Sequence, residues 1–285
     1  HDEGADTDVA IKILDPNLLS TETQRADFLK VAKKTIKIHH PNVVRVFQAG
    51  TEGDLVFYTM TYLEGLTLRK IIDLRAEKKQ VFSFSEAIPL VNQLAEGVQG
   101  LSKLKFHGAL SPNNVLVLPD ILKITGVSHF QGLPHSNFIK RLSNRPGGVY
   151  LSPEARDSIN RVSLRSDVFS IAAIFAEMTI GVVYGRDIEE WNRVISRLDP
   201  AMRKVLERAL SPKASDRYSS AMKFVDALLD AVGEEDYPVI ELEPDEEIDA
   251  DSVELTAGDV RSGEVEVLPD NYEAEISVSS VDLEA

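Results

Sequence analysis

The sequence predicts an α+β fold in two lobes, in which a small β-rich lobe precedes a larger helical lobe and an acidic tail ends the chain. Three observations support this prediction. Short β-branched runs, which are typical of strands, occur near the start at residues 9–14 and 43–48. Apolar residues at helical spacing dominate the later part of the chain. Composition then changes sharply after Gly233, where the helical stripes end.

The first predicted helix follows the first strand. Residues 22–38 place Phe28, Ala32 and Ile36 at helical spacing, which favours one buried face. Lysines occupy its other faces, and they favour either an ordinary solvated surface or a docking surface for an acidic partner or for the chain's own tail. These lysines are Lys30, Lys33, Lys34 and Lys37.

Later helices carry clearer end signals. Ser83 followed three residues later by Glu86 is a capping box, and an apolar stripe continues from it. Residues 168–178 are apolar on nearly every face, which predicts a helix buried all round. Asp199-Pro200 is typical of a helix start, and the last helix is expected near 219–232.

Composition excludes several kinds of site. The chain has no cysteine, which excludes disulfides, thiolate metal sites and cysteine nucleophiles and fits the reducing cytoplasm. No apolar run reaches the roughly 18 residues that a membrane span needs. Because the chain begins at His1 and not at Met, we expect it to be a fragment or a processed product, such as the cytosolic part of a larger protein.

The formal net charge of −15 is concentrated in the tail. Residues 234–285 hold 19 Asp or Glu and one Arg, a charge of −18, which leaves +3 for the preceding 233 residues. An acidic segment with few aromatic residues is expected to be mostly disordered. It would also repel phosphates, so we expect no nucleic-acid partner.

Several short motifs occur in a fixed order along the chain. They are Val9-Ala10-Ile11-Lys12, His40-Pro41-Asn42-Val43-Val44, Tyr62-Leu63-Glu64-Gly65, His107-Gly108-Ala109-Leu110-Ser111-Pro112-Asn113-Asn114, Tyr150-Leu151-Ser152-Pro153-Glu154, Arg165-Ser166-Asp167-Val168-Phe169-Ser170 and Arg217. In that order they resemble the protein kinase family, in particular its bacterial Ser/Thr kinases. The resemblance covers residues 8–233. It implies a bilobal kinase-like fold, with residues 1–62 as an N-lobe that lacks the Gly-rich-loop strands and residues 63–233 as the C-lobe.

The resemblance also identifies positions where the family's chemistry is missing. The family's catalytic loop is H-R-D-L-x-x-x-N, whose Asp accepts the proton of the substrate hydroxyl, and here Ala109 takes that position and Ser111 takes that of the usual Lys. The metal-binding Asp of D-F-G corresponds to Gly126, and the αC glutamate to Val31. Residues 1–8 contain no Gly-rich loop. We therefore predict no catalytic residue, no metal, no cofactor and no enzyme activity.

A residual nucleotide pocket is implied by the resemblance, formed by Ala10, Lys12, Met60, Leu116 and Asn114, with Met60 as the gatekeeper. Because Lys12 lacks its family partners, we expect its side chain to turn to water or to lose its proton more easily. Asn114 is expected to act as a structural hydrogen-bonding residue.

Residues that hold the family's architecture are retained. The resemblance implies that Asp167 fixes the backbone of the catalytic loop and that Glu154 and Arg217 pin the activation segment to the C-lobe. His107 is expected to be a core residue. The resemblance therefore implies that the family's catalytic groups are missing, whereas the residues that hold its fold are retained.

The predicted function is a catalytically inactive pseudokinase that scaffolds or regulates bacterial Ser/Thr kinase signalling. Expected partners are an active Ser/Thr kinase, or a forkhead-associated domain that reads phosphorylated Thr256. The alternative for the tail is a solubilising linker without a function of its own. Segments 264–268 and 272–281 alternate acidic and apolar residues and could also add as a strand to a partner's sheet edge. Two alternatives stay open, a non-catalytic nucleotide-binding switch and an atypical phosphoryl or nucleotidyl transferase.

Overall fold

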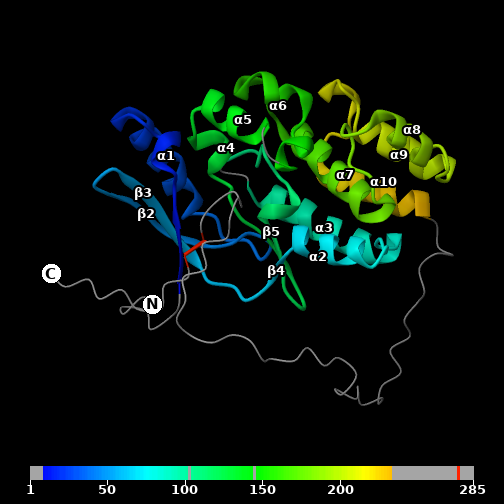
Figure 1. The fold of residues 1–285 in the computed structure, drawn as a ribbon, viewed down its shortest axis with the longest axis horizontal. Coiled ribbons are helices and arrows are strands. Elements are labelled where there is room, and N and C mark those ends of the chain that lie inside the picture. Colours follow the sequence, from blue (N-terminus) through cyan, green and yellow to red (C-terminus); the bar gives the residue numbers. More distant parts are fainter. Residues whose placement is uncertain (1–8, 102–103, 144–145, 233–274, 277–285) are drawn as a thin grey trace, which may run out of the picture.

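The computed structural model describes residues 9–101, 104–143, 146–232 and 275–276 of the chain. The two predicted lobes are present. Figure 1 shows α1, β2 and β3 on one side of the molecule and the helices from α3 onward on the other. The α+β, kinase-like class predicted from the sequence is therefore confirmed.

The smaller lobe is an antiparallel sheet with one helix packed against it. The sheet has the order β2-β3-β1-β7, and its paired neighbours run antiparallel. Its elements are β1 (Val9–Ile13), α1 (Glu22–Thr35), β2 (Val46–Glu52), β3 (Leu55–Thr61) and β7 (Glu275–Ile276).

Helix α1 begins as its sequence dictates. Thr21 accepts a hydrogen bond from the backbone N–H of Gln24, and Gln24 returns one to Thr21, which completes a capping box. The predicted stripe is only partly correct, because Phe28 and Ala32 are buried whereas Ile36 lies just past the last helical residue.

The strand predicted over residues 43–48 begins later than expected. Val43 instead forms a parallel bridge with Ile124, and the Val44 N–H donates to the Ile124 carbonyl at 2.8 Å. These contacts tie the segment to a second sheet, so the ladder with β3 starts only at Val46.

The second sheet joins the two lobes. It has the antiparallel order β4-β5-β6, formed by β4 (Leu66–Thr67), β5 (Val115–Val117) and β6 (Leu122–Ile124). Residues 62–65 connect β3 to β4. Gly65 is needed there, because a Cβ at this position would lie 2.8 Å from the carbonyl oxygen of Val117.

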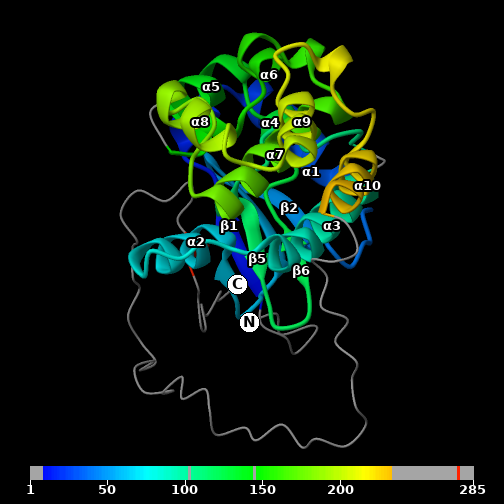
Figure 2. The same cartoon turned by 90° about the vertical axis from the view of Figure 1, so that its right-hand side faces the viewer.

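The larger lobe is built around helix α7, which Figure 2 shows near the middle of the helical layer. Every residue of α7 from Ser166 to Thr179 is buried, as the all-round apolar sequence predicted. Helices α3, α9 and α10 pack against it. The helices of this lobe are α2 (Leu68–Glu77), α3 (Phe84–Gly100), α4 (His129–Gly132), α5 (His135–Ser143), α6 (Pro153–Asp157), α7 (Leu164–Ile180), α8 (Ile188–Ile195), α9 (Pro200–Ala209) and α10 (Ala221–Val232).

The predicted helix ends are largely confirmed. Ser83 and Glu86 form a reciprocal capping box at the start of α3. Asp199 accepts from the Ala201 N–H at 2.7 Å, and Pro200 occupies the first turn of α9. Local side-chain chemistry alone sets both ends, so a sequence pattern could identify them.

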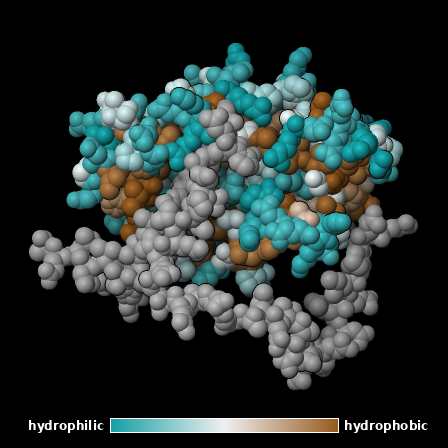
Figure 3. All heavy atoms as spheres, viewed as in Figure 1, coloured by the Kyte–Doolittle hydropathy of each residue, from teal (hydrophilic) through white to brown (hydrophobic). Residues whose placement is uncertain are grey.

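The apolar side chains form two cores. The larger surrounds α3 and α7, and the smaller lies between the first sheet, α1, α4 and α5. Figure 3 shows mainly hydrophilic side chains over the helices at the top of the view, with apolar residues visible between them.

The predicted disorder of residues 234–285 falls outside the described residues, apart from Glu275–Ile276, which form β7. Within the described ranges, no helix combines the length and apolar character required to cross a membrane.

Candidate functional site

The loop from His107 to Asn114 lies between α3 and β5 and is anchored to α7 by Asp167. The carboxylate of Asp167 accepts hydrogen bonds from the backbone N–H groups of His107 and Gly108, each at 2.8 Å. Burial raises the pKa of Asp167 to about 7, although the two N–H donors lower it. Asp167 thus satisfies two backbone donors that would otherwise be buried without partners.

His107 links this loop to the end of β6. Its ring is buried, with Nε2 3.0 Å from the carbonyl oxygen of Thr125 and Nδ1 3.3 Å from the backbone N–H of Ala109. The carbonyl can only accept and the N–H can only donate, which assigns the proton of a neutral ring to Nε2. Burial lowers the pKa of His107 to about 4, so the ring is neutral near pH 7.

Asn114 closes the loop on itself. Its Oδ1 accepts from the Ser111 N–H at 2.8 Å, and its Nδ2 donates to the Ala109 carbonyl at 3.1 Å. The structure therefore brings Ala109, Ser111 and Asn114 into one turn. The Asn114 side chain is engaged at both ends by the loop that carries it.

Gly126 lies beside this turn. It has a φ of 73°, and a Cβ built on it would lie 3.6 Å from Asn114 Nδ2 and 3.2 Å from His129 Nδ1. The Cα of Gly126 therefore faces the loop. Within the described residues, no group of three or more His, Cys, Asp or Glu is arranged to hold a metal ion.

Three residues of the implied nucleotide pocket, Ala10, Met60 and Leu116, share one apolar cluster. Ala10 of β1 pairs in register with Met60 of β3, and both belong to the smaller core with Leu116 and Ala109. The Thr125 hydroxyl contacts the Met60 sulfur at 3.7 Å. The cavity next to Met60 measures only about 10 Å³, which is the space of about one water.

The expectation that Lys12 turns to water is wrong. Lys12 is only 2% exposed and interacts within the protein. Burial lowers the pKa of both His107 and His129 most, and the charge of Lys12 lowers both pKa values further. Val31 of α1 is half-buried and packs against the larger core.

An aromatic group at the junction of α1, β3 and α4 was not foreseen. The Tyr58 hydroxyl lies 3.1 Å from His129 Nε2, and the His129 ring stacks on Phe28 at 6.2 Å between centroids. Burial, above all, lowers the pKa of His129 well below its usual value. The alternation of Val56, Tyr58 and Met60 in β3 points Tyr58 inward, but no sequence signal identified His129 as its partner.

Glu154 and Arg217 form the ion pair that the resemblance implied. The side chain of Arg217 is fully buried and donates to both Glu154 oxygens, at 2.7 and 2.9 Å. The Ser166 hydroxyl donates to Glu154 at 2.6 Å. Burial raises the pKa of Glu154, but the hydrogen bonds from Arg217 and Ser166 outweigh it and hold that pKa below its usual value.

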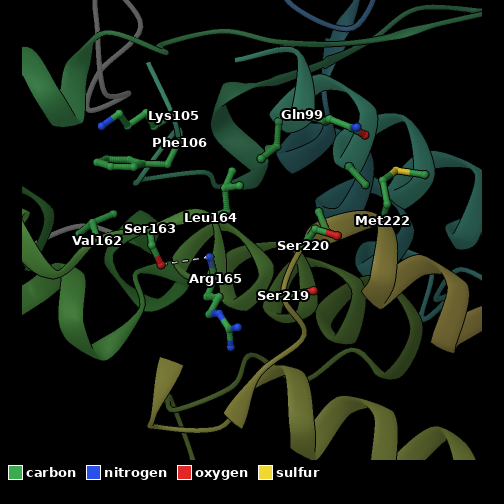
Figure 4. Close-up of a pocket in the computed structure, with 13 residues that line it drawn as sticks. Gln99, Lys105, Phe106, Val162, Ser163, Leu164, Arg165, Ser219, Ser220 and Met222 are labelled. Atoms are coloured by element: carbon green, nitrogen blue, oxygen red, sulfur yellow. Dashed lines mark hydrogen bonds between the residues drawn. The ribbon is translucent and has the colours of Figure 1, made fainter. Parts of the chain in front are cut away.

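A second hollow lies between the ends of α3, α7 and α10, next to the residues that lead into the loop (Figure 4). Its volume of about 730 Å³ is in the range of small-molecule sites, and Phe106, Leu164 and Met222 are among its apolar lining residues. The Arg165 guanidinium donates to the carbonyl of Ser215 at 2.8 Å. The lining comes from segments far apart in the chain, so no local motif predicted this hollow.

Comparisons with known proteins give the family. Residues 1–203 match the family model described as protein tyrosine and serine/threonine kinase. The chain is 28% identical over 208 residues to a Clostridium perfringens protein named "Probable serine/threonine-protein kinase", covering 72% of this chain and 28% of that protein. It is 23% identical over 272 residues to the serine/threonine-protein kinase PknD of Chlamydia trachomatis, covering 80% of this chain and 29% of PknD. The chain thus spans about a third of the length of such relatives.

A solved structure agrees in fold. The PknI kinase domain of Mycobacterium tuberculosis is similar with a TM-score of 0.63 and 20% identity, covering 78% of this chain and 85% of that domain. Our prediction that the chain is not an enzyme is contradicted by these findings, because the relatives are named kinases and the fold is that of kinase domains, which points to an enzyme. That prediction depended on a few positions, whereas the match covers most of the chain. The chain belongs to the protein tyrosine and serine/threonine kinase family.

Proposed function

We propose that this chain works in bacterial Ser/Thr kinase signalling as a protein-binding module that scaffolds or regulates its partners. The observation that carries the proposal is an exposed basic face on α1. Lys30, Lys33 and Lys34 lie at i, i+3 and i+4, which puts them side by side on the helix, and Lys37 follows in the turn after Thr35, the last helical residue. This α1 lysine face consists of Lys30, Lys33, Lys34 and Lys37, all of them exposed.

The opposite side of α1 fixes the helix in place. Phe28, Ala32 and Thr35 are buried, so the helix cannot turn the lysines inward without exposing its apolar residues. In the described parts of the chain, Lys30, Lys33 and Lys34 form no ion pair. Three neighbouring cations without an ion pair among the described residues, Lys30, Lys33 and Lys34, favour an acidic partner and speed its association.

The site residues enter the proposal as positions in the family's loop. We propose that Ala109 takes the family position of the catalytic base, Gly126 that of the metal-binding Asp and Val31 that of the αC glutamate. None of these side chains is a carboxylate, whereas the groups that hold the loop, such as Asp167, make their hydrogen bonds. This pattern supports a role in which the chain binds its partners through its folded surface.

Phosphoryl transfer to a protein hydroxyl is the second candidate, because the relatives are named serine/threonine kinases. Nucleotide binding in the cluster of Ala10, Met60 and Leu116 would be its first step, and such binding alone would make the chain a nucleotide-dependent switch. A ligand at a hundredfold excess over its Kd stabilises the fold by about 2.7 kcal/mol, so thermal titration with ATP and Mg²⁺ detects it.

The proposed partners are an active Ser/Thr kinase and a forkhead-associated domain that reads phosphorylated Thr256, a residue outside the described parts of the chain. The proposed location is the cytoplasm, which suits a chain without cysteine.

The decisive experiment compares three versions of the full chain in pull-downs from the native host. One is wild type, one carries Lys30→Glu, Lys33→Glu and Lys34→Glu, and a control carries Lys204→Glu and Lys213→Glu, which are exposed lysines of the larger lobe. We expect the first substitution set, and not the control, to lose the partners. Equal recovery by all three would contradict the proposal. Labelled ATP with Mg²⁺ and the recovered proteins as acceptors then measures transfer, and incorporation above background would support the second candidate.

A further inference from the structure

The hollow between α3, α7 and α10 leaves apolar side chains open to solvent. Leu164, the first residue of α7, is 40% exposed, and Figure 4 shows it between Phe106 on one side of the hollow and Met222 on the other. Ala95 and Val98 of α3 complete the apolar part of this wall. Covering such surface is favourable, because it removes apolar atoms from water.

The serine hydroxyls at the two helix starts are already engaged. Ser163 Oγ accepts from the backbone N–H of Arg165 at 3.3 Å, and Ser220 Oγ accepts from that of Lys223 at 3.3 Å. Both hydroxyls cap the helices that they precede, so a ligand in the hollow does not have to satisfy them. The ligand that fits best is therefore largely apolar.

The charged side chains at the hollow are both positive. Among the described residues that line it, Lys105 and Arg165 carry charge and none is acidic. Lys105 is exposed beside Phe106, and it forms no ion pair within the described ranges. The Arg165 guanidinium lies 2.8 to 3.3 Å from uncharged acceptors, the backbone carbonyls of Ala214, Ser215 and Arg217. Two cations without a carboxylate nearby favour a ligand that carries an acidic group.

We infer that this hollow is a binding site for a small carboxylate with an apolar body, of which octanoate is the simplest probe. The apolar part covers Leu164 between Phe106 and Met222, and the carboxylate faces Lys105. The volume of about 730 Å³ accommodates a ligand of this class. This inference goes beyond the proposed protein-binding role and does not depend on the α1 lysine face.

The hollow also adjoins the anchor of the loop. Phe106 directly precedes His107, whose backbone N–H donates to Asp167 at 2.8 Å, and Leu164 begins the helix that carries Asp167. The Phe106 carbonyl accepts from Gln131 at 2.8 Å. A ligand that packs against both Phe106 and Leu164 therefore restrains the two segments that the Asp167 hydrogen bond joins.

Calorimetric titration of the full chain with octanoate tests the site and its charge. We expect saturable binding with a Kd below about 1 mM, which a ligand of this size can supply. Lys105→Gln should weaken binding about threefold to fivefold, because an exposed ion pair contributes little more than that. The control Lys204→Gln removes an exposed charge outside the lining residues and should change nothing. A titration without saturation, or equal affinity in the two variants, would overturn the inference.

A second pair of variants places a carboxylate inside or outside the hollow. Leu164→Glu is expected to keep the fold, because glutamate is favourable in the first turn of a helix, and circular dichroism checks this. Its charge should repel octanoate and weaken binding at least about tenfold. The control is Leu229→Glu, since Leu229 is 42% exposed on α10 and is not among the lining residues. Equal binding by these two variants would place octanoate elsewhere and refute the site, and Lys105→Gln carries the test if Leu164→Glu does not fold.

Hydrogen exchange of the full chain, measured by mass spectrometry, tests the restraint on the loop. At a tenfold excess of octanoate over its Kd, the amides of His107 and Gly108 should exchange about threefold to tenfold more slowly, because their opening has to release the ligand. Amides of β2, which lies in the other lobe, should not change. Unchanged exchange of the loop amides in the saturated protein would refute the restraint.

Discussion

Replacing Arg217 with alanine should strongly destabilise the fold while leaving the surface unchanged. Its guanidinium donates to both oxygens of Glu154 and to the carbonyls of Ser211, Arg165 and Pro212, at 2.7 to 3.2 Å. It also lies over the Phe169 ring at 4.9 Å.

The magnitude follows from what the truncation leaves behind. The Glu154 side chain is only 11% exposed and would keep only the Ser166 hydroxyl as a side-chain donor. Removing one partner of a buried ion pair costs about 3–5 kcal/mol, because the other charge stays buried and unpaired. For a domain of this size, that loss lowers Tm by about 6–20 °C.

Urea denaturation followed by circular dichroism measures this cost. The matched control is Arg203→Ala, because Arg203 pairs with Glu207 at 4.0 Å on the surface and should contribute about 0–1 kcal/mol. Arg217→Lys should fall between the two, since lysine keeps the charge but not the two-pronged geometry. If Arg217→Ala costs no more than Arg203→Ala, the ion pair does not stabilise the fold as argued.

The pH dependence provides an independent check. In the wild type, the pKa of Glu154 lies below its usual value of 4.5, so its contribution to stability is present above pH 4.5 and is lost as pH falls through the lower, folded-state pKa. Without Arg217, burial would instead raise that pKa, and protonation would relieve the buried charge. The stability difference between wild type and Arg217→Ala should therefore narrow as pH falls, first above pH 4.5, where Glu154 of the variant takes up its proton, and further below pH 4.5, where the wild type loses the contribution of the pair. A constant difference would argue against this electrostatic origin.

Two further outcomes are expected. Gly108→Ala should destabilise the chain by about 2–5 kcal/mol in the same urea assay, because φ is 85° there and a Cβ would lie 2.5 Å from the Phe130 ring; a loss below 1 kcal/mol would contradict the stated geometry. Phosphorylation of Thr256 should create binding to a purified forkhead-associated domain, measured by calorimetry, because its phosphate would engage an Arg cluster. Thr256→Ala treated with the same kinase should not bind, and binding equal to that of the phosphorylated wild type would refute the site.

Local chemistry made much of the fold predictable. The capping box of Ser83 and Glu86 and the Asp199 cap concern residues within one helical turn, so their pattern is visible in the sequence. Helix α7 is apolar on nearly every face, and this pattern likewise predicted that the helix is buried. The order of the motifs implied that Asp167 contacts the loop and that Glu154 pairs with Arg217, and the structure contains both contacts. The motifs gave a wrong prediction about enzyme activity. That prediction depended on the residue types at Ala109, Ser111, Gly126 and Val31, whereas the match to kinases covers most of the chain.

Contacts between distant residues depended on the tertiary structure. Tyr58 meets His129 across 71 positions, and Val43 pairs with Ile124 in place of extending β2. Lys12 is buried and does not turn to water, because the packing around β1 determines its exposure. The alternation of the tail predicted a segment able to add to a sheet, but only the tertiary structure places Glu275 and Ile276 beside β1. A sequence pattern reports which residues prefer burial or pairing, whereas their partners are chosen when the chain brings remote segments together.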